Sequence, residues 1–441
     1  MTDPGRLEQS QMKIAQHMID RPMTLAQKII SRAAGQSFVF PGEVVTAKVD
    51  LAMIHDSGGP RRVEPILRDL GVGLFDASKV VLISDHFIPG DTKDAADILA
   101  LTRAWAAKQG VTFYDGEGIC HVVLPERGHL SPGMFVVGGD SHSPTGGAFG
   151  AYMFGVGATE MAGVLATGEI WITVPKTILI EWQNQLPPGV MAKDIMLALC
   201  GRLGLDGGQY QAIEFCGEAV RSLSMQDRMT LANMAAELGA QTGLIAPDAV
   251  TKAFLRNAGG AIGNTHDLKT DLGAPLMAKH VFDAATLEPQ VAAPHSPANA
   301  RPVSQSVGEI IDVAYIGACT GAKYTDLQAA AKILSGSRVE TNTRLLVAPA
   351  SRLDQDRANN DGTLGILLEA GAELLPNACG ICAGYGNARL GENTKCISST
   401  ARNFQGRMGA ASSQVWLASP MTVAASAIEG RIADPRDWLP Q

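Results

Sequence analysis

The sequence predicts a multidomain α/β protein. Short β-rich runs alternate with helical stretches along most of the chain, which is typical of parallel or mixed sheets covered by helices. The chain has 441 residues, too many for one compact core, because a domain holds roughly 100–200 residues. The composition, 46% hydrophobic and 18% charged, excludes wholesale disorder.

A helix is expected near the start of the first region, residues 1–175. In the segment MTLAQKIISRAAG, Leu25, Ile29 and Ile30 fall on one helix face, and Gly35 ends the helix. Strands are expected in VVTAKVDLAMI, KVVLIS, VTFYD, MFVVGG and WITVPKTILI.

Further elements follow in order. The segment DTKDAADILALTRAWAAKQG predicts a helix with Asp91 as N-cap and its end at Gly110. The second region, residues 176–290, contains the helical segments VMAKDIMLALCGRLG and MTLANMAAELGA. The Pro- and Ala-rich segment LEPQVAAPHSPANARPVSQ lacks periodicity and is interpreted as a linker. The third region, residues 291–441, resumes the α/β alternation with EIIDVAYIG, AKYTDLQAAAKIL and TRLLVAPAS.

The net charge of the chain and its first residues restrict the class of function. Lys and Arg number 36 and Asp and Glu 44, a net charge of −8, so nucleic-acid binding is disfavoured and an anionic substrate must be bound by local arginines. The start MTDPGRLEQSQMK lacks an export signal, and no apolar stretch reaches the roughly 18 residues of a membrane span. Seven cysteines, an odd number, argue against a disulfide framework. We therefore expect a soluble, cytoplasmic protein.

Polar residues follow three predicted strands or turns at the sheet edge where α/β proteins place their sites. These residues are Asp85, His86, His121, Asp140, Ser141 and His142. Carboxylate–imidazole pairs suit proton transfer, because the acid fixes the tautomer of the ring and raises its basicity. Structural histidines in ordinary tight turns fit the same pattern.

Three cysteines are flanked by Gly and Ala in loop-like segments: Cys319 in YIGACTGAKYTDL, and Cys379 and Cys382 in PNACGICAG. A C-x-x-C places two thiolates within reach of one metal centre, and a distant loop can add a third, leaving a coordination position for substrate. A helix is expected after Cys319, with Thr320 as N-cap. A zinc site completed by His or Asp, a redox dithiol and inert cysteines remain alternatives. The other cysteines, interpreted as small buried hydrophobes, are Cys120, Cys200, Cys216 and Cys396.

Two more pairs of polar residues are candidates. Asn233 and Glu237 lie four residues apart and share one helix face, for which a solvated polar face is the preferred interpretation. Arg402 and Arg407 lie in STARNFQGRMG after the cysteine pair. Guanidinium groups bind carboxylates bidentately, so two arginines beside a metal imply a di- or tricarboxylate ligand.

Together these segments resemble the aconitase superfamily, and within it the branch of 3-isopropylmalate dehydratase large subunits and homoaconitase-like relatives. The resemblance runs from MTLAQKI through PGEVVTAKVDLAMIHD, SDHFIP, GEGICH, GGDSHSPTGGAFGAYMFGVGATE and LANMAAELGA to GACTGAK, CGIC, RNFQGRMG and ASPMTVAASAIEGRI. It implies three α/β/α domains around a [4Fe–4S] cluster, without the swivel domain, which a separate small subunit would supply. It also implies a hydro-lyase that interconverts 2-isopropylmalate and 3-isopropylmalate in leucine synthesis.

The resemblance assigns roles residue by residue. The implied cluster ligands are Cys319, Cys379 and Cys382, with one iron left for the substrate. The implied proton-handling pairs are Asp85 with His86, His121 with Asp140, and His142 with Glu237. The implied substrate-binding residues are His55, Ser141, Asn233, Arg402 and Arg407. His86 would be the acid toward the departing hydroxyl, and the small subunit would supply a serine base.

The sequence also departs from its relatives. They often have Asn where Gly321 stands and Gln where Val122 stands. The sequence therefore leaves the identity of the substrate undetermined. Homoaconitate and smaller alkylmalate, citraconate or maleate-type acids are alternatives. A structural or electron-transfer iron–sulfur centre would need a fourth thiolate, for which Cys396 is the nearest candidate.

Overall fold

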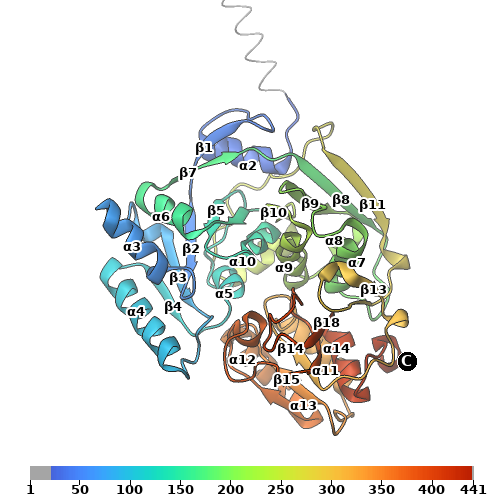
Figure 1. Ribbon diagram of the computed structural model, residues 1–441. Helices are drawn as coiled ribbons and strands as arrows, with labels where there is room; N and C mark the ends of the chain where they lie inside the picture. The colour runs from blue at the N-terminus through green and yellow to red at the C-terminus, as the bar shows by residue number, and fades with distance from the viewer. Residues whose placement is uncertain (1–20, 440–441) are drawn as a thin grey trace, which may run out of the picture.

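The computed structural model describes residues 21–439, whose strands form three larger sheets and one antiparallel pair (Figure 1). The first sheet is parallel, in the order β4-β3-β2-β5-β6. Its strands are β2 (Leu51–His55), β3 (Val80–Ser84), β4 (Thr112–Asp115), β5 (Phe135–Gly138) and β6 (Tyr152–Gly155). Because all five run the same way, their carboxyl ends lie at one edge.

Helices cover both faces of this sheet. The outer ones are α3 (Pro60–Leu70), α4 (Lys93–Gln109) and α6 (Ala158–Thr167), and the inner ones are α5 (Cys120–Glu126) and the 3₁₀ helix η2 (Ser143–Phe149). Alternate strand residues point to opposite faces. Met53 and Ile83 therefore pack in the core that contains α5, whereas Ile54 and Leu82 pack with the outer helices.

The first expected helix is confirmed. It is α2 (Leu25–Ala34), with Leu25, Ile29 and Ile30 buried and Gly35 in the left-handed conformation at its end. The strand pair beside it is β1 (Val44–Lys48) with β7 (Glu169–Thr173).

The N-cap predicted for α4 is wrong. Thr92 caps the helix, because its hydroxyl accepts the amide hydrogen of Ala95 at 3.2 Å, whereas the Asp91 carboxylate accepts a hydrogen bond from Asn387. The predicted end at Gly110 is confirmed.

The second sheet is parallel, in the order β10-β9-β8-β11. Its strands are β8 (Thr177–Gln183), β9 (Ala212–Cys216), β10 (Thr242–Leu244) and β11 (Ala278–Asp283). Its helices are α7 (Ala192–Leu203), α8 (Glu218–Ser222), α9 (Met225–Met234) with η3 (Ala235–Leu238), and α10 (Ala249–Asn257). Both helical segments expected in this region are confirmed, as α7 and as α9 with η3.

The third sheet has the order β13-β12-β18-β17-β14-β15-β16, and β12 is antiparallel to both neighbours. Its strands are β12 (Gln290–Ala292), β13 (Ala300–Pro302), β14 (Val313–Ile316), β15 (Arg344–Val347), β16 (Ala372–Leu374), β17 (Lys395–Ser398) and β18 (Gln414–Ala418). Its helices are α11 (Tyr324–Leu334), α12 (Arg352–Asn360), α13 (Thr363–Ala370) and α14 (Pro420–Glu429). The short 3₁₀ helices elsewhere are η1 (Ala77–Lys79), η4 (Ala284–Thr286), η5 (Pro297–Asn299), η6 (Val303–Gln305), η7 (Gly380–Ala383) and η8 (Pro435–Trp438).

Two expectations in this part of the chain are wrong. The segment interpreted as a linker contributes β12 and β13 to the third sheet, because main-chain pairing there needs no side-chain periodicity. Helix α11 begins at Tyr324 with Lys323 as N-cap. Thr320 lies in the loop before it and donates its hydroxyl to the carbonyl oxygen of Ser399 at 3.0 Å.

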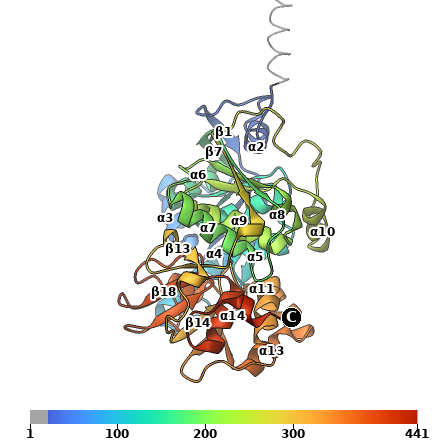
Figure 2. The same ribbon diagram turned by 90° about the vertical axis from the view of Figure 1, so that its right-hand side faces the viewer.

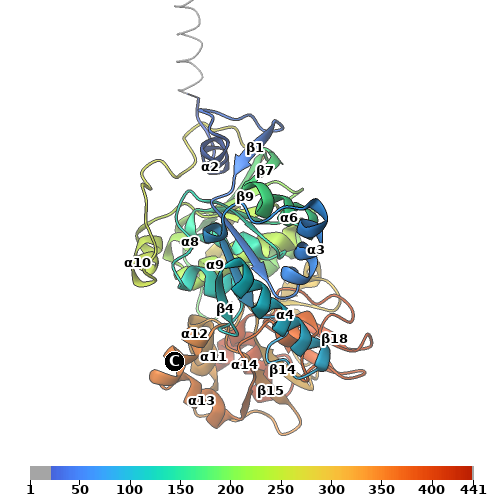
Figure 3. The same ribbon diagram turned by 90° about the vertical axis from the view of Figure 1, so that its left-hand side faces the viewer.

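The third sheet and its helices form a lobe below the other two sheets (Figures 2 and 3). The three larger sheets lie within 51–155, 177–283 and 290–418. The domain boundaries 1–175, 176–290 and 291–441 stay a prediction. No helix among residues 21–439 combines the length and apolar character needed to cross a bilayer.

Candidate active site

The loop after β3 carries a carboxylate–imidazole pair. Nδ1 of His86 lies 2.6 Å from Oδ1 of Asp85, and the second oxygen of Asp85 accepts the amide hydrogen of Cys120 at 2.8 Å. Both residues are buried. Burial disfavours the imidazolium, but the Asp85 carboxylate outweighs it and raises the pKa of His86 to about 9. At neutral pH His86 therefore holds a proton that it can donate.

The end of β2 places His55 and Asp56 beside this pair. Nδ1 of His55 accepts the amide hydrogens of Ser57 and Gly58 at 3.2 and 3.3 Å, so its Nε2 donates to the Gly139 carbonyl at 3.0 Å. Burial and the charge of His86 lower the pKa of His55 to about 4. His55 is thus a neutral ring in a fixed tautomer.

Sequence reasoning missed Asp56. This fully buried carboxylate accepts the amide hydrogens of His86 and Phe87 at 3.1 and 2.9 Å. It holds the His86 loop against the end of β2. The signal was present, because Asp56 directly follows β2, as Asp85 directly follows β3.

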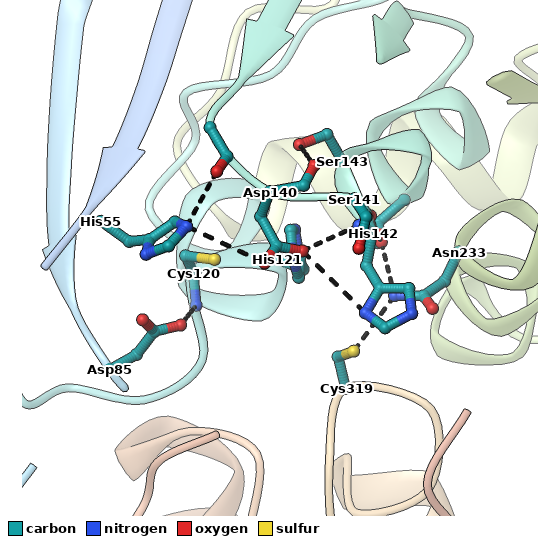
Figure 4. A network of polar contacts seen from close by, with 12 residues as sticks. His55, Asp85, Cys120, His121, Asp140, Ser141, His142, Ser143, Asn233 and Cys319 are labelled. Carbon is teal, nitrogen blue, oxygen red and sulfur yellow. Dashed lines mark hydrogen bonds and ion pairs between the residues drawn. The ribbon is translucent and has the colours of Figure 1, made fainter. Parts of the chain in front are cut away.

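Asp140, in the loop after β5, is the centre of a second group of polar residues, which includes His121 and His142. Its Oδ1 accepts hydrogen bonds from Nε2 of His121 and from the amide of His142, both at 2.8 Å. Figure 4 shows Asp140 among the rings of His55, His121 and His142. Although burial opposes ionisation, His121 and the other imidazoles keep the pKa of Asp140 well below its usual range. Nδ1 of His121 is buried without a partner among the described residues, as a group awaiting a ligand would be.

His142 connects Asp140 and His121 to η3, through Glu237. Its Nε2 lies 2.9 Å from Oε1 of Glu237, which also accepts Nε–H of Arg402 at 2.7 Å. Nη1 of Arg402 donates to the Ser141 hydroxyl at 2.8 Å. A cavity of about 390 Å³ opens beside Asp140, Ser141 and Arg402. The cavity therefore makes these three residues accessible to a small ligand.

The expectation of a solvated face at Asn233 and Glu237 is wrong. They are 0% and 4% exposed, because loops from the first and third sheets cover this face. Asn233 donates through Nδ2 to the Thr145 hydroxyl at 2.8 Å and to the Cys319 sulfur at 3.1 Å, and its Oδ1 is buried without a partner among residues 21–439 (Figure 4).

The thiols of Cys319, Cys379 and Cys382 approach these groups from the third sheet. Cys319 and Cys382 are buried, and the amide of Cys379 donates to the carbonyl oxygen of Asp85 at 2.8 Å. A hydrogen bond from Cys379 lowers the pKa of Cys382 to about 6. Burial opposes this fall in the pKa, and the positive charge of Arg407 adds to it. Nε of Arg407 is itself buried without a partner within the described chain. The donor set therefore suits a thiolate-ligated metal centre.

Cys396 is not beside these thiols. It lies inside β17 in an apolar core, with its thiol hydrogen-bonded to the Ile397 carbonyl oxygen at 3.5 Å. Cys120 and Cys200 are also buried, as expected of small hydrophobes, and Cys216 is half-buried.

The fold and site thus define an α/β enzyme in which three thiols on loops of the third sheet approach the carboxylate–imidazole pairs of the first sheet. The family model of the aconitase family (aconitate hydratase) matches residues 80–310 and 305–430. The chain belongs to the aconitase family and is a hydro-lyase. Members of this family generally carry a [4Fe–4S] cluster.

Several relatives align over almost the whole chain. The chain is 46% identical to 3-isopropylmalate dehydratase large subunit 1 of Methanopyrus kandleri, over 94% of this chain and 99% of the relative. It is 41% identical to the 3-isopropylmalate dehydratase large subunit of Aquifex aeolicus, over 94% and 97%. It is 40% identical to a probable methanogen homoaconitase large subunit of Methanothermobacter thermautotrophicus, over 94% and 98%.

Proposed function

We propose that this chain is the cluster-bearing large subunit of a hydro-lyase that interconverts 2-isopropylmalate and 3-isopropylmalate by dehydration and rehydration. The observation that carries the proposal is the approach of three thiols on loops of the third sheet to the carboxylate–imidazole pairs of the first sheet. The printed names of the Methanopyrus and Aquifex relatives support this choice of substrate.

The residues present fit an iron–sulfur cluster. We assign Cys319, Cys379 and Cys382 as its ligands, because thiolates are the usual ligands of such clusters. Asn233 donates a hydrogen bond to one of these sulfurs, and Arg407 lies against another. When bound, a cluster with three protein ligands supplies a Lewis-acidic iron with one open position.

The acid–base work falls to residues of the first sheet. His86 donates its proton to the departing hydroxyl, because its Asp85 partner keeps it protonated at neutral pH. Asp140 fixes the ring of His121, and Glu237 fixes the ring of His142. Arg402 and Arg407 bind the carboxylates of the substrate, since guanidinium groups pair with them bidentately. Ser141, whose hydroxyl accepts a hydrogen bond from Arg402, is a polar residue of the same substrate site.

We further propose a separate small subunit with a swivel domain, which supplies the serine base that removes the proton next to the hydroxyl. The names of the relatives, which are large subunits, support a partner of this kind. The large subunit by itself is then largely inactive.

A second substrate, homoaconitate, is favoured by one finding. The Methanothermobacter relative, at 40% identity, is named a probable homoaconitase large subunit. Proton donation by His86 would be the same for both substrates. Only the substrate group that the enzyme recognises beside the two carboxylates would differ.

Anaerobic reconstitution with iron and sulfide tests the proposal. The reconstituted chain is mixed with candidate small subunits and assayed by ultraviolet absorbance for the unsaturated acid formed from isopropylmalate, homocitrate or a methylmalate. Dehydration of isopropylmalate at least tenfold faster than the others supports the proposal. Preference for homocitrate selects the second substrate, and turnover of none by a loaded complex rejects both.

A further inference from the structure

Two buried lysines that the acid–base chemistry does not use hold the Cys319 loop, residues 317–323. Lys193 reaches it from α7, and Lys323 lies at its end. They are 1% and 0% exposed. Lysine is almost never fully buried without a reason, because its ammonium loses its hydration.

The loop follows a path that few sequences can take. A Cβ atom on Gly317 would overlap the ring of Tyr315, and one on Gly321 would overlap Ser399. Ala318 has φ 67°, in the left-handed region that favours glycine. Other contacts must therefore hold this backbone in place.

Lys323 supplies part of that restraint. Its Nζ donates to the Cys319 carbonyl oxygen at 2.9 Å and to the Thr230 hydroxyl of α9 at 3.0 Å. It also pairs with the Asp326 carboxylate at 2.7 Å. The charge of Lys323 is thus balanced inside the protein, and its effect on the loop is geometric.

Lys193 differs because its contacts are all neutral. Its Nζ donates to the Ser399 carbonyl oxygen at 2.8 Å, to the Thr320 hydroxyl at 3.3 Å and to the Thr400 carbonyl oxygen. No carboxylate among residues 21–439 forms an ion pair with it. An ammonium buried without an anion is costly, so the position requires negative charge nearby.

The Cys382 and Cys319 thiols are the strongest source of negative charge acting on Lys193, ahead of the Glu237 carboxylate. Burial lowers the pKa of Lys193 to about 8, and the Cys382 and Cys319 thiols oppose this fall more than any other group does. Thr320, which Lys193 contacts, is the next residue after Cys319.

We propose that Lys193 is a positioning residue that supplies the buried counter-charge of the cluster while Lys323 fixes the Cys319 main chain. This inference rests on the proposed function, because it assumes that Cys319 and Cys382 bind the cluster. A positive charge beside a cluster favours its reduced, more negative form. Lys193 therefore raises the reduction potential and slows loss of the cluster.

The test uses the full chain, reconstituted anaerobically, in four forms: the natural sequence, Lys193→Met, Lys193→Gln and Lys93→Met. Lys193→Gln keeps a hydrogen-bond donor but no charge. Lys93 is an exposed lysine of α4 that pairs with Asp97, so it provides the matched control. Two quantities are measured. One is the reduction potential of the cluster, monitored by electron paramagnetic resonance, and the other is the rate of iron release to a chelator.

Both Lys193 variants should shift the ratio of oxidised to reduced cluster about tenfold toward the oxidised form, which corresponds to about 59 mV for one electron. They should also release iron at least tenfold faster, and Lys93→Met should change neither. The apo chain should melt no lower in Lys193→Met, because an unbalanced charge has been removed.

Unchanged potentials with a lower melting temperature of the apo chain would show a structural role and overturn the inference. If Lys193→Met does not fold, Lys193→Gln alone decides, because it too removes the charge. Absence of a cluster in the natural sequence is a different result, and it rejects the proposed function instead.

Discussion

The rings of His55 and His86 stack with centroids 4.3 Å apart and 16° between their planes. The amides of Ser57 and Gly58 make Nδ1 of His55 an acceptor, while Asp85 keeps His86 protonated. One ring is therefore neutral and the other charged at neutral pH. Of the two rings, only His86 therefore carries a proton that it can donate at neutral pH.

The pH dependence of stability should reveal this charge. Despite burial, Asp85 raises the pKa of His86 from an unfolded value of about 6.5 to about 9. Since the folded state binds this proton more tightly, the stabilisation is complete below pH 6.5 and disappears as the pH rises through 9. Urea unfolding of the natural chain and His86→Gln should give free energies of unfolding that differ most at pH 6 and converge by pH 10. A constant difference would contradict the assignment.

Substitutions of Cys379 and Cys396 should have opposite effects on the cluster. Cys379→Ser should lose cluster absorbance and activity, because one of three ligands is gone. Cys396→Ser should keep both, although the buried hydroxyl lowers the free energy of unfolding by about 1–3 kcal/mol. Iron and sulfide analysis after reconstitution measures the outcome. Loss of the cluster in Cys396→Ser would instead favour a fourth thiolate and a closed, non-catalytic centre.

Arg402 should control substrate binding. Arg402→Gln removes charge-assisted hydrogen bonds worth about 1.5–3 kcal/mol, so kcat/KM should fall roughly 10- to 150-fold. Most of the effect should appear in KM, because the carboxylate is bound in both the ground and the transition state. Arg436→Gln is the control, since the side chain of Arg436 hydrogen-bonds Asp434 and Glu288, neither of which is a candidate site residue. Equal kinetics in both variants would exclude the role.

Gly147 should be irreplaceable for steric reasons. A Cβ there would overlap the Gly243 carbonyl oxygen where η2 packs on β10, so Gly147→Ala should lower the free energy of unfolding by about 1–3 kcal/mol or more. Gly163, inside α6, has nothing within 4 Å of an added Cβ. Gly163→Ala should therefore raise the free energy of unfolding by about 0.5–1 kcal/mol. Thermal or urea unfolding checks both, and matching effects of the same sign would be inconsistent with this packing.

Much of the candidate site could be predicted from the chain because parallel strands end at one edge. Asp85 and Asp140 follow apolar strands that pair with β2, and so they come together with His55. Spacing alone favours a solvated face at Asn233 and Glu237, which the structure contradicts, because helical spacing tells which residues share a face and not what covers it. The catalytic and ligand roles stay predictions.

Patterns in the sequence predict the α/β alternation, the acidic and histidine residues at strand ends, and the three cysteines set among Gly and Ala. Those features are local, because they depend on the periodicity and chemistry of neighbouring residues. Two contacts come from the folded chain alone. Lys193 lies beside the Cys319 loop, although Cys319 comes 126 positions later in the chain. Asp56 holds the His86 loop. Contacts between distant segments arise from how sheets pack, and packing has no signature within a short stretch of sequence.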